Sequence, residues 1–202
     1  MTNSIFCFDL DGTLTRRELL PLIANEVGLE HEFDVLTKLT IDGAISFEES
    51  LRLRFAILKH VPVSIVQDII FSASLFDDVI YFIRHQRERC FIVTGNLDVW
   101  IKPLMQSIGC NYFSSRVQEL NGKLVSLDHI LKKSTAVNAL RKRYPDSRIV
   151  AFGDGLNDYP MFEAADQAVA IGLTHQPSPV LIAKANYIIY EEDALCRLLN
   201  TL

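Results

Sequence analysis

Two aspartates spaced two residues apart are the part of this sequence best suited to chemistry. Asp9 and Asp11 directly follow the apolar run 5–8. Because an extended chain repeats every two residues, both carboxylates are expected to point the same way from the end of a buried strand. Carboxylates held together favour either a raised pKa on one of them or a cation between them. An Asp-Gly pair is also common in turns, so the string indicates a site only in combination with other parts.

A second pair of aspartates follows another apolar run. Asp154 and Asp158 come after residues 149–152, and Asp158 is expected in the first turn of the next helix, near its positive end. Oxygen ligands from several strand ends are typical of a Mg²⁺ site. A calcium-binding loop is excluded, because the segment lacks the alternating oxygen ligands and the final Glu of such a loop. A turn followed by a helix N-cap remains an alternative.

Two weaker signals lie between these pairs. Thr94-Gly95-Asn96 follows the apolar run 90–93, and a hydroxyl next to an unobstructed backbone N–H suits a phosphate oxygen, although the same string also suits a helix start. Lys132 and Lys133 precede a helical pattern. A lysine at a helix start is unfavourable for the helix dipole, so it either extends into solvent or serves a fixed anion.

The spacing of apolar residues predicts the elements that position these side chains. Short apolar runs separated by helical patterns indicate an α/β fold with a parallel sheet covered on both faces. Residues 16–75 contain helical patterns and no convincing strand, so we expect a helical insertion after the first strand, with 1–15 and 76–202 forming the core. Its signals include Gly28 as a helix stop, a capping box formed by Ser46 and Glu49, and a helix start at 62–64. Asn121-Gly122 predicts a tight hairpin.

Composition excludes several classes of protein. The chain has 202 residues, 49% of them hydrophobic, and a net charge of −5, with no basic patch that would indicate nucleic-acid binding. It contains no long apolar run and no basic, apolar leader, so no membrane association is expected. The widely spaced cysteines are interpreted as buried thiols in a reducing compartment. A cytoplasmic protein, either a monomer or a homodimer, is the simplest interpretation.

In combination, the order Asp-x-Asp, Thr-Gly, Lys, then Asp with Asp four residues later resembles the four motifs of the haloacid dehalogenase superfamily. The resemblance extends from Phe8 to the region 192–195, nearly the whole chain. Within the superfamily, the chain is most similar to the phosphoserine phosphatases. Residues 45–54 of the insertion resemble the cap segment of those enzymes, and this match is more specific to substrate than the core motifs are. A Rossmann-like three-layer core with a small helical cap is therefore implied.

The resemblance also implies a reaction and the residues that perform it. It predicts a Mg²⁺-dependent phosphomonoester hydrolase, with Asp9 as the nucleophile that forms an aspartyl-phosphate and Asp11 as the general acid and base. The metal would be held by Asp9, the backbone carbonyl of Asp11 and Asp154, with Asp158 orienting ligands from behind. The residues expected to bind phosphate or substrate are Thr94, Gly95, Lys133, Asn157, Glu18 and Arg54.

Substrate choice is expected to depend on the cap. By resemblance, Glu18 would bind the ammonium of phosphoserine and Arg54 its carboxylate, although both also suit ordinary positions on exposed helix faces. The sequence departs from the family at Asn96, where a second glycine is usual, and the choice of Lys133 over Lys132 depends on the similarity of residues 133–140 alone. A phosphatase or phosphotransferase acting on another small phosphorylated metabolite is one alternative. A non-catalytic phosphate-binding protein is the other.

Overall fold

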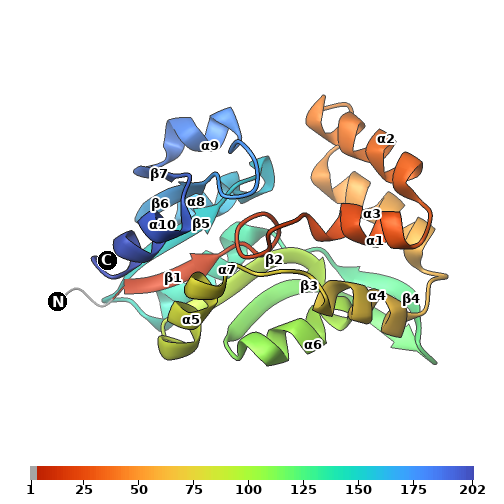
Figure 1. The fold of residues 1–202 in the computed structure, drawn as a ribbon, viewed down its shortest axis with the longest axis horizontal. Helices are drawn as coiled ribbons and strands as arrows, with labels where there is room; N and C mark the ends of the chain where they lie inside the picture. Colours follow the sequence, from red (N-terminus) through yellow and green to blue (C-terminus); the bar gives the residue numbers. More distant parts are fainter. Residues whose placement is uncertain (1–3) are drawn as a thin grey trace.

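In the computed structural model, residues 4–202 are described and form a seven-stranded sheet with helices on both faces (Figure 1). The strand order is β4-β3-β2-β1-β5-β6-β7, and within the described residues only the β3–β4 pairing is antiparallel. This arrangement confirms the expected α/β class. The strands are β1 (Ser4–Phe8), β2 (Cys90–Leu97), β3 (Asn111–Leu120), β4 (Lys123–His129), β5 (Arg148–Gly153), β6 (Gln167–Ile171) and β7 (Tyr187–Ile189).

The register of the central strands aligns the three segments that carry the motifs. β1 lies between β2 and β5, and Phe8 at its end is paired with Ile92 on one side and with Phe152 on the other. Parallel strands end at the same edge of a sheet, so the residues that follow these three positions lie next to one another. Open α/β sheets bind their ligands at this edge.

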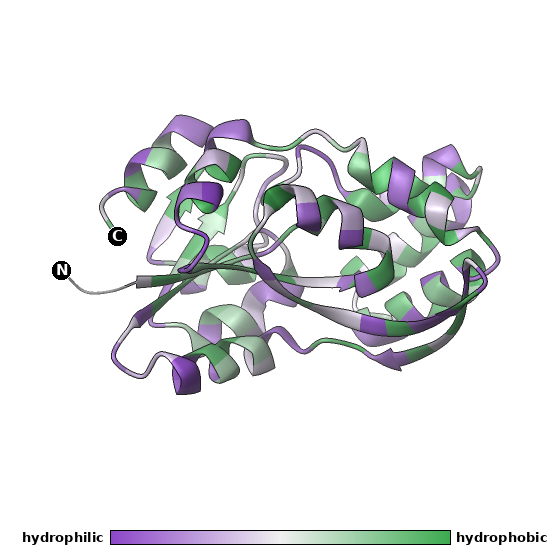
Figure 2. Ribbon diagram, turned by 90° about the horizontal axis from the view of Figure 1, so that it is seen from below, coloured by the Kyte–Doolittle hydropathy of each residue, from purple (hydrophilic) through white to green (hydrophobic). Residues whose placement is uncertain are grey.

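Alternate residues of β1 belong to two separate hydrophobic clusters, as the two-residue repeat of a strand requires. Phe6 and Phe8 pack with helices α5, α6 and α10, while Ile5 and Cys7 pack with α7, α8 and α9. Many of the helices carry both hydrophobic and hydrophilic residues in Figure 2. The expected three layers are therefore present. The core helices are α5 (Asp77–His85), α6 (Asp98–Ile108), α7 (Lys133–Arg143), α8 (Tyr159–Ala164), α9 (Pro179–Lys184) and α10 (Glu192–Leu199).

The segment between β1 and α5 is helical, as the sequence predicts. Its helices are α1 (Leu19–Glu26), α2 (Glu30–Ile41), α3 (Phe47–Leu58) and α4 (Val63–Phe71). Gly28 follows α1 with φ +72°, and Ser46 and Glu49 form the predicted capping box at the start of α3. The two stretches of chain that connect this helical segment to the core lie side by side, because Thr15 pairs with Leu75 in an isolated antiparallel bridge.

Helix α4 attaches this segment to the core. The backbone N–H of Val63 donates to the carbonyl of Gly122 at 2.9 Å, and Gln67 Nε2 donates to the carbonyl of Val99 at 2.7 Å. The Asn121-Gly122 turn has φ values of 53° and 75°, so the predicted hairpin is confirmed. No helix within residues 4–202 is long and apolar enough to cross a membrane.

Candidate active site

A buried lysine joins two of the predicted aspartates at the carboxyl edge of the sheet. Lys133 Nζ donates to Asp9 Oδ1 and to Asp158 Oδ1, both at 2.5 Å, and all three side chains are almost completely buried. Lys133 is the first residue of α7, whereas Lys132 precedes the helix and is exposed. The lysine nearest the acidic cluster is therefore the one that the sequence comparison favours.

Asp158 is held from both of its oxygens. Its Oδ2 accepts the backbone N–H groups of Asp154 and Gly155, each at 3.1 Å, while its Oδ1 is bonded to Lys133. Asp158 is the last residue of a short 3-10 helix, η1 (Leu156–Asp158), which leads directly into α8. The sequence predicted Asp158 in the first turn of the helix, and it lies immediately before that turn. With both oxygens occupied, Asp158 orients Lys133 and the loop that carries Asp154.

The cluster concentrates negative charge in a buried space. Burial and then the charge of Asp158 raise the pKa of Asp9 well above its usual range, against the opposing effect of Lys133. Burial alone lowers the pKa of Lys133, but the Asp158 and Asp9 carboxylates together raise it above its ordinary value. Burial also raises the pKa of Asp154. Lys133 balances the charge of only one of the two carboxylates that it contacts, so a further cation would stabilise this space.

Asp11 is partly buried, two residues beyond Asp9, and is fixed by two N–H donors. The backbone N–H of Leu19, at the start of α1, donates to Asp11 Oδ1 at 3.0 Å, and Asn96 Nδ2 donates to Asp11 Oδ2. Burial, followed by the charge of Glu18, raises the pKa of Asp11 to about 7. A carboxyl group with a pKa near neutrality suits proton transfer in both directions.

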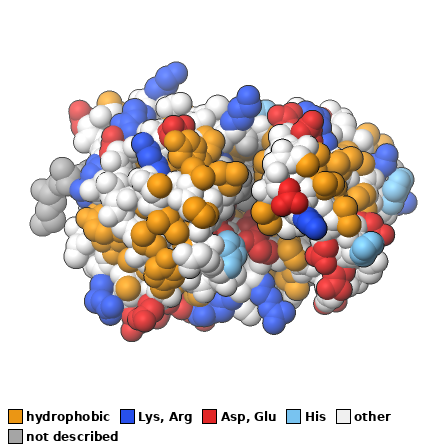
Figure 3. All heavy atoms as spheres, turned by 90° about the horizontal axis from the view of Figure 1, so that it is seen from above, with side chains coloured by type: hydrophobic (Ala, Val, Ile, Leu, Met, Phe, Trp, Pro, Cys, Tyr) orange, Lys and Arg blue, Asp and Glu red, His pale blue; other side chains and the backbone are white. Residues whose placement is uncertain are grey.

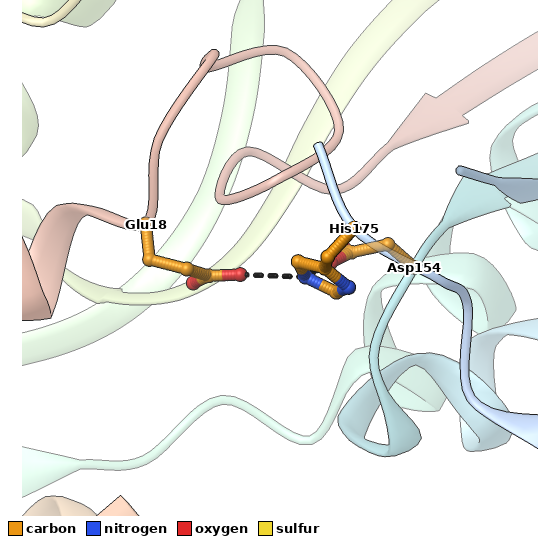
Figure 4. Close-up of side chains that lie close together, drawn as sticks. All are labelled: Glu18, Asp154 and His175. Atoms are coloured by element: carbon orange, nitrogen blue, oxygen red, sulfur yellow. Dashed lines mark hydrogen bonds and ion pairs between the residues drawn. The ribbon is translucent and has the colours of Figure 1, made fainter. Parts of the chain in front are cut away.

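His175 connects the insertion to the core at this site (Figure 4). The imidazole lies between Glu18 and Asp154, with Nε2 at 2.7 Å from Asp154 Oδ2 and 3.0 Å from Glu18 Oε1. Hydrogen bonds to Asp154 and then to Glu18 raise the pKa of His175 to about 11. The other oxygen of Asp154, Oδ1, accepts the hydroxyl of Thr13 at 3.1 Å. Glu18 is therefore already paired with a protein cation.

The surface between the two halves of the molecule is hollowed, and acidic side chains and a histidine lie within the hollow (Figure 3). This hollow contains a cavity of about 80 Å³. A separate, larger open groove of about 530 Å³ lies along β3 and α7, and none of the predicted site residues line it. The small cavity combines core residues with residues of the insertion, and it is the candidate substrate pocket. Its lining residues are Asp9, Asp11, Glu18, Leu20, Phe47, Leu51, Gly95, Asn96 and Asn157.

Three predicted substrate residues lie outside this lining: Thr94, Arg54 and Lys133, which is bonded to Asp9 beneath it. Thr94 is fully buried, and its hydroxyl oxygen accepts the backbone N–H of Asn96 at 3.1 Å. Arg54 is bonded to hydroxyls within the insertion, namely those of Ser50 and Thr37. Their roles in binding substrate stay predictions.

Several residues at the site were not predicted from the sequence. Phe47 contacts Gly95 across the pocket, Thr13 bonds to Asp154, and His175 bridges Glu18 and Asp154. Thr13 belongs to the first aspartate motif, so its position in that string was a usable signal. The loop that carries His175 offered none, because its approach to the site depends on tertiary structure.

The donor set fits a hard divalent cation. Asp9, Asp154 and Asp158 bring carboxylate oxygens to within 4.8 Å of one another. Gly12, with φ +68°, makes room for one of these carboxylates, because a Cβ at that position would overlap Asp154 Oδ2. A cluster of oxygen donors without thiolates favours Mg²⁺ over softer metals.

The fold and the site together define a class: parallel-sheet proteins with an acidic cluster at the ends of β1 and β5, covered by a helical insertion. Comparison with known proteins identifies the family. Residues 6–163 match the family of haloacid dehalogenase-like hydrolases. The chain belongs to this family, which confirms the expectation that it is a hydrolase.

Many of the relatives that the chain resembles are named phosphoserine phosphatases. The enzyme of Methanocaldococcus jannaschii is 30% identical over 94% of this chain and 93% of its own length, and that of Lactococcus lactis is 26% identical over 95% and 92%. A substrate-bound phosphoserine phosphatase complex has a TM-score of 0.82 and 28% identity, covering 100% of this chain and 99% of that one. A phospho-aspartyl intermediate analogue of phosphoserine phosphatase has a TM-score of 0.81 and 27% identity, covering all of both chains.

Proposed function

We propose that this chain is a Mg²⁺-dependent phosphomonoester hydrolase that forms an aspartyl-phosphate on Asp9, and that O-phosphoserine is its substrate. The observation that carries this proposal is the contact of Lys133 with both Asp9 and Asp158 at 2.5 Å, at the strand edge where Asp154 also lies. This contact supports the proposal, because the carboxylate proposed as nucleophile, a buried cation and a carboxylate proposed to bind metal lie together. The solved relative described as a phospho-aspartyl intermediate analogue supports the covalent route.

Asp9, Asp154 and the backbone carbonyl of Asp11 would hold the Mg²⁺. When bound, the ion neutralises the charge of a phosphate dianion, which otherwise repels a carboxylate nucleophile. Lys133 supplies a second positive charge, held against Asp9 and Asp158 so that little reorganisation is needed during reaction. The backbone N–H of Gly95, at the pocket wall, is the proposed donor to a further phosphate oxygen.

The proposed reaction proceeds in two displacements. An oxygen of Asp9 attacks phosphorus while the bond to the alcohol oxygen breaks, and Asp11 transfers its proton to that leaving oxygen. Water then attacks the aspartyl-phosphate as Asp11 takes a proton from it, which releases inorganic phosphate and restores Asp9. The two N–H donors on Asp11 hold its carboxyl in position for both transfers. Asn157, at the pocket edge, is proposed to orient the phosphate.

The environment of Arg54 supports the proposal that the substrate carries a second anionic group. The residue is 7% exposed, its Nε has no hydrogen-bond partner, and it takes part in no ion pair within residues 4–202. Phe47, Leu51 and Arg54 are separated by four and then three residues, so they share one face of α3. Since Phe47 and Leu51 line the pocket, Arg54 lies next to it along the helix, where the carboxylate of phosphoserine would satisfy a buried cation.

A different small phosphomonoester is the second candidate. Glu18, the proposed partner of the ammonium, is already bonded to His175, and Asn96 stands where the family usually has glycine. Either feature is able to change the preferred leaving group or to admit an alcohol acceptor in place of water, which would make the chain a phosphotransferase.

Release of inorganic phosphate from a panel of phosphorylated metabolites, with and without Mg²⁺, tests the proposed activity. Wild type is expected to release phosphate only with the metal, and Asp9→Asn is expected to release none. Asp146→Asn, at an exposed position, is the matched control and should keep full activity. Folded wild-type protein that hydrolyses no monoester would support a non-catalytic phosphate-binding protein, and near-normal turnover by Asp9→Asn would exclude the covalent route.

A comparison of three substrates tests the proposed specificity. Phosphoethanolamine lacks the carboxylate of phosphoserine, and phosphoglycolate lacks its ammonium, so each should show a lower kcat/KM. Arg54→Met should reduce the advantage of phosphoserine over phosphoethanolamine. Arg52→Met is its control, because Arg52 is exposed on the same helix and pairs with Glu48. Equal efficiency on all three substrates in wild type would remove both Glu18 and Arg54 from recognition.

A further inference from the structure

Asn96 occupies a position in the pocket wall from which it contacts the proposed acid and base. The residue is 5% exposed and belongs to β2. Its Nδ2 donates to Asp11 Oδ2 and lies 3.3 Å from Thr94 Oγ1, while its backbone N–H donates to the same threonine oxygen. A glycine at this position would keep the backbone bond and lose both side-chain bonds. Asn96 therefore does something that the usual family residue cannot do.

The contact with Asp11 fixes the plane of a reacting carboxyl group. Leu19 N–H donates to one oxygen of Asp11, and Asn96 Nδ2 donates to the other. With one donor on each oxygen, rotation of the carboxyl group would break a hydrogen bond on either side. Each oxygen keeps a second lone pair, so a proton for the leaving group can still be carried. Asn96 thus positions Asp11 without occupying its proton-transfer site.

The other end of the same amide is unsatisfied. Asn96 Oδ1 is buried and has no hydrogen-bond partner within residues 4–202. A buried acceptor left unpaired costs about 1–3 kcal/mol, and such atoms are rare in folded proteins. Reversing the amide would take the Nδ2 donor away from Asp11 and bring Oδ1 against it, which pairs two acceptors when Asp11 is ionised. The free acceptor therefore belongs to a side chain that lines the pocket and contacts Asp11, the proposed proton donor to the leaving group.

We infer that Asn96 selects the leaving group: its Oδ1 accepts a hydrogen bond from an O–H or N–H donor on the alcohol part of the phosphomonoester, while its Nδ2 orients Asp11. The preferred substrates are thus phosphate esters of amino-alcohols or polyols, and esters of apolar alcohols are poor substrates. This inference rests on the proposed phosphatase activity and narrows its substrate class. It predicts that a single donor atom on the leaving group changes the efficiency of hydrolysis.

Two esters of equal size separate this contact from all others. 2-Hydroxyethyl phosphate and n-propyl phosphate differ only in a terminal O–H in place of a methyl group. Wild type should hydrolyse the hydroxyl ester with a kcat/KM on the order of tenfold higher than the propyl ester. A ratio of this size corresponds to about one hydrogen bond to a buried acceptor. Asn96→Leu should bring the ratio close to one, because leucine has similar volume and no acceptor. Both rates should also fall in this variant, since Asp11 loses a donor.

Controls distinguish the possible failures. Asn138→Leu, at an exposed position on α7, should keep the wild-type ratio, and Asn96→Gly, the residue usual in the family, should lose the preference as Asn96→Leu does. Titration calorimetry of both esters with Asp9→Asn and with Asp9→Asn/Asn96→Leu measures the same preference in binding. An unchanged ratio in both Asn96 variants would overturn this inference and leave the phosphatase proposal intact. Failure of wild type to hydrolyse any monoester would overturn both.

Discussion

Phe47, the first residue of α3, packs directly on Gly95 in the second half of β2. A Cβ built on Gly95 would lie 2.7 Å from Phe47 Cζ, closer than side chains tolerate, so the aromatic ring occupies the space that any larger residue would need. Both residues line the pocket. The helical insertion is therefore closed over the core in this structure, and closure depends on the absence of a side chain at residue 95.

Gly95→Ala should prevent this closure. The backbone N–H that is proposed to hold phosphate is retained, so the variant tests the contact between Phe47 and the core. A displacement of about 1 Å in a catalytic site can cost on the order of 10²-fold in rate, and a loss of this order in kcat/KM is expected. The measurement is phosphate release from the best ester of the panel.

A double-mutant cycle separates the steric clash from other effects. Phe47→Leu removes the ring atoms that a methyl group at residue 95 would meet, so Gly95→Ala/Phe47→Leu should recover part of the activity that Gly95→Ala loses. Losses that simply add in the double variant would contradict a clash between these two residues.

The sequence predicted the parts of this fold that depend on local rules. Apolar runs gave β1, β2 and β5, because buried parallel strands are apolar on both faces, and the Asn121-Gly122 turn gave the hairpin. The capping box located the start of α3 at Ser46. Each of these signals lies within a few residues of what it predicts, and the shared strand edge then brought the motifs together.

The parts that were missed depend on long-range packing. Phe47 belongs to the segment 45–54 that resembles the cap of the family, but nothing in its neighbourhood indicates contact with Gly95. His175 lies in an irregular loop after β6 and reaches a residue 157 positions away in sequence. Helix α2 was not recognised as a separate element, because its apolar face is narrow, with only Phe33 and Leu36 buried.

The two adjacent lysines should differ sharply in effect. Lys133 is bonded to Asp9 and Asp158 and is 4% exposed, so Lys133→Met removes the only cation between two buried carboxylates among the described residues. Removal of one partner from a buried ion pair typically costs about 3–5 kcal/mol. Loss of phosphate release and a lower free energy of unfolding are both expected.

Lys132→Met is the matched control for this experiment, because Lys132 is exposed and carries no ion pair within residues 4–202. It should change activity and stability little. If Lys132→Met abolished phosphate release while Lys133→Met did not, the assignment of the phosphate-binding lysine would have to be reversed.

Removal of His175 should strengthen metal binding. His175 Nε2 lies 2.7 Å from Asp154 Oδ2, an oxygen of a proposed metal ligand, and the raised pKa of His175, about 11, keeps the imidazole charged at neutral pH. A cation at this oxygen competes electrostatically with Mg²⁺. His175→Gln should therefore lower the Mg²⁺ concentration required for half-maximal binding, measured by titration calorimetry. His31→Gln, at an exposed position, should leave it unchanged, and weaker binding by His175→Gln would mean that the histidine assists the metal.

The pH dependence of stability in metal-free protein should report the carboxyl group of Asp11. Its pKa is raised from 3.8 to about 7, mainly by burial, so the folded state holds a proton that the unfolded state has lost between these values. Raising the pH through this window therefore lowers the free energy of unfolding. The loss of stability from ionising buried Asp11 is absent below about pH 4 and complete above about pH 7.

Asp11→Asn lacks this titration. The free energy of unfolding of Asp11→Asn relative to wild type should therefore rise by on the order of 1–3 kcal/mol from pH 4 to pH 8. Urea denaturation in EDTA at both pH values measures it, with Asp146→Asn, at an exposed position, as the control that should show little change. An amide at residue 11 also alters the bonds to Leu19 and Asn96, and this effect is present at both pH values. The quantity compared is therefore the difference in relative stability between the two pH values. A relative stability that falls with rising pH would mean that the native site lowers the pKa of Asp11, and it would then be a poor proton donor near neutrality.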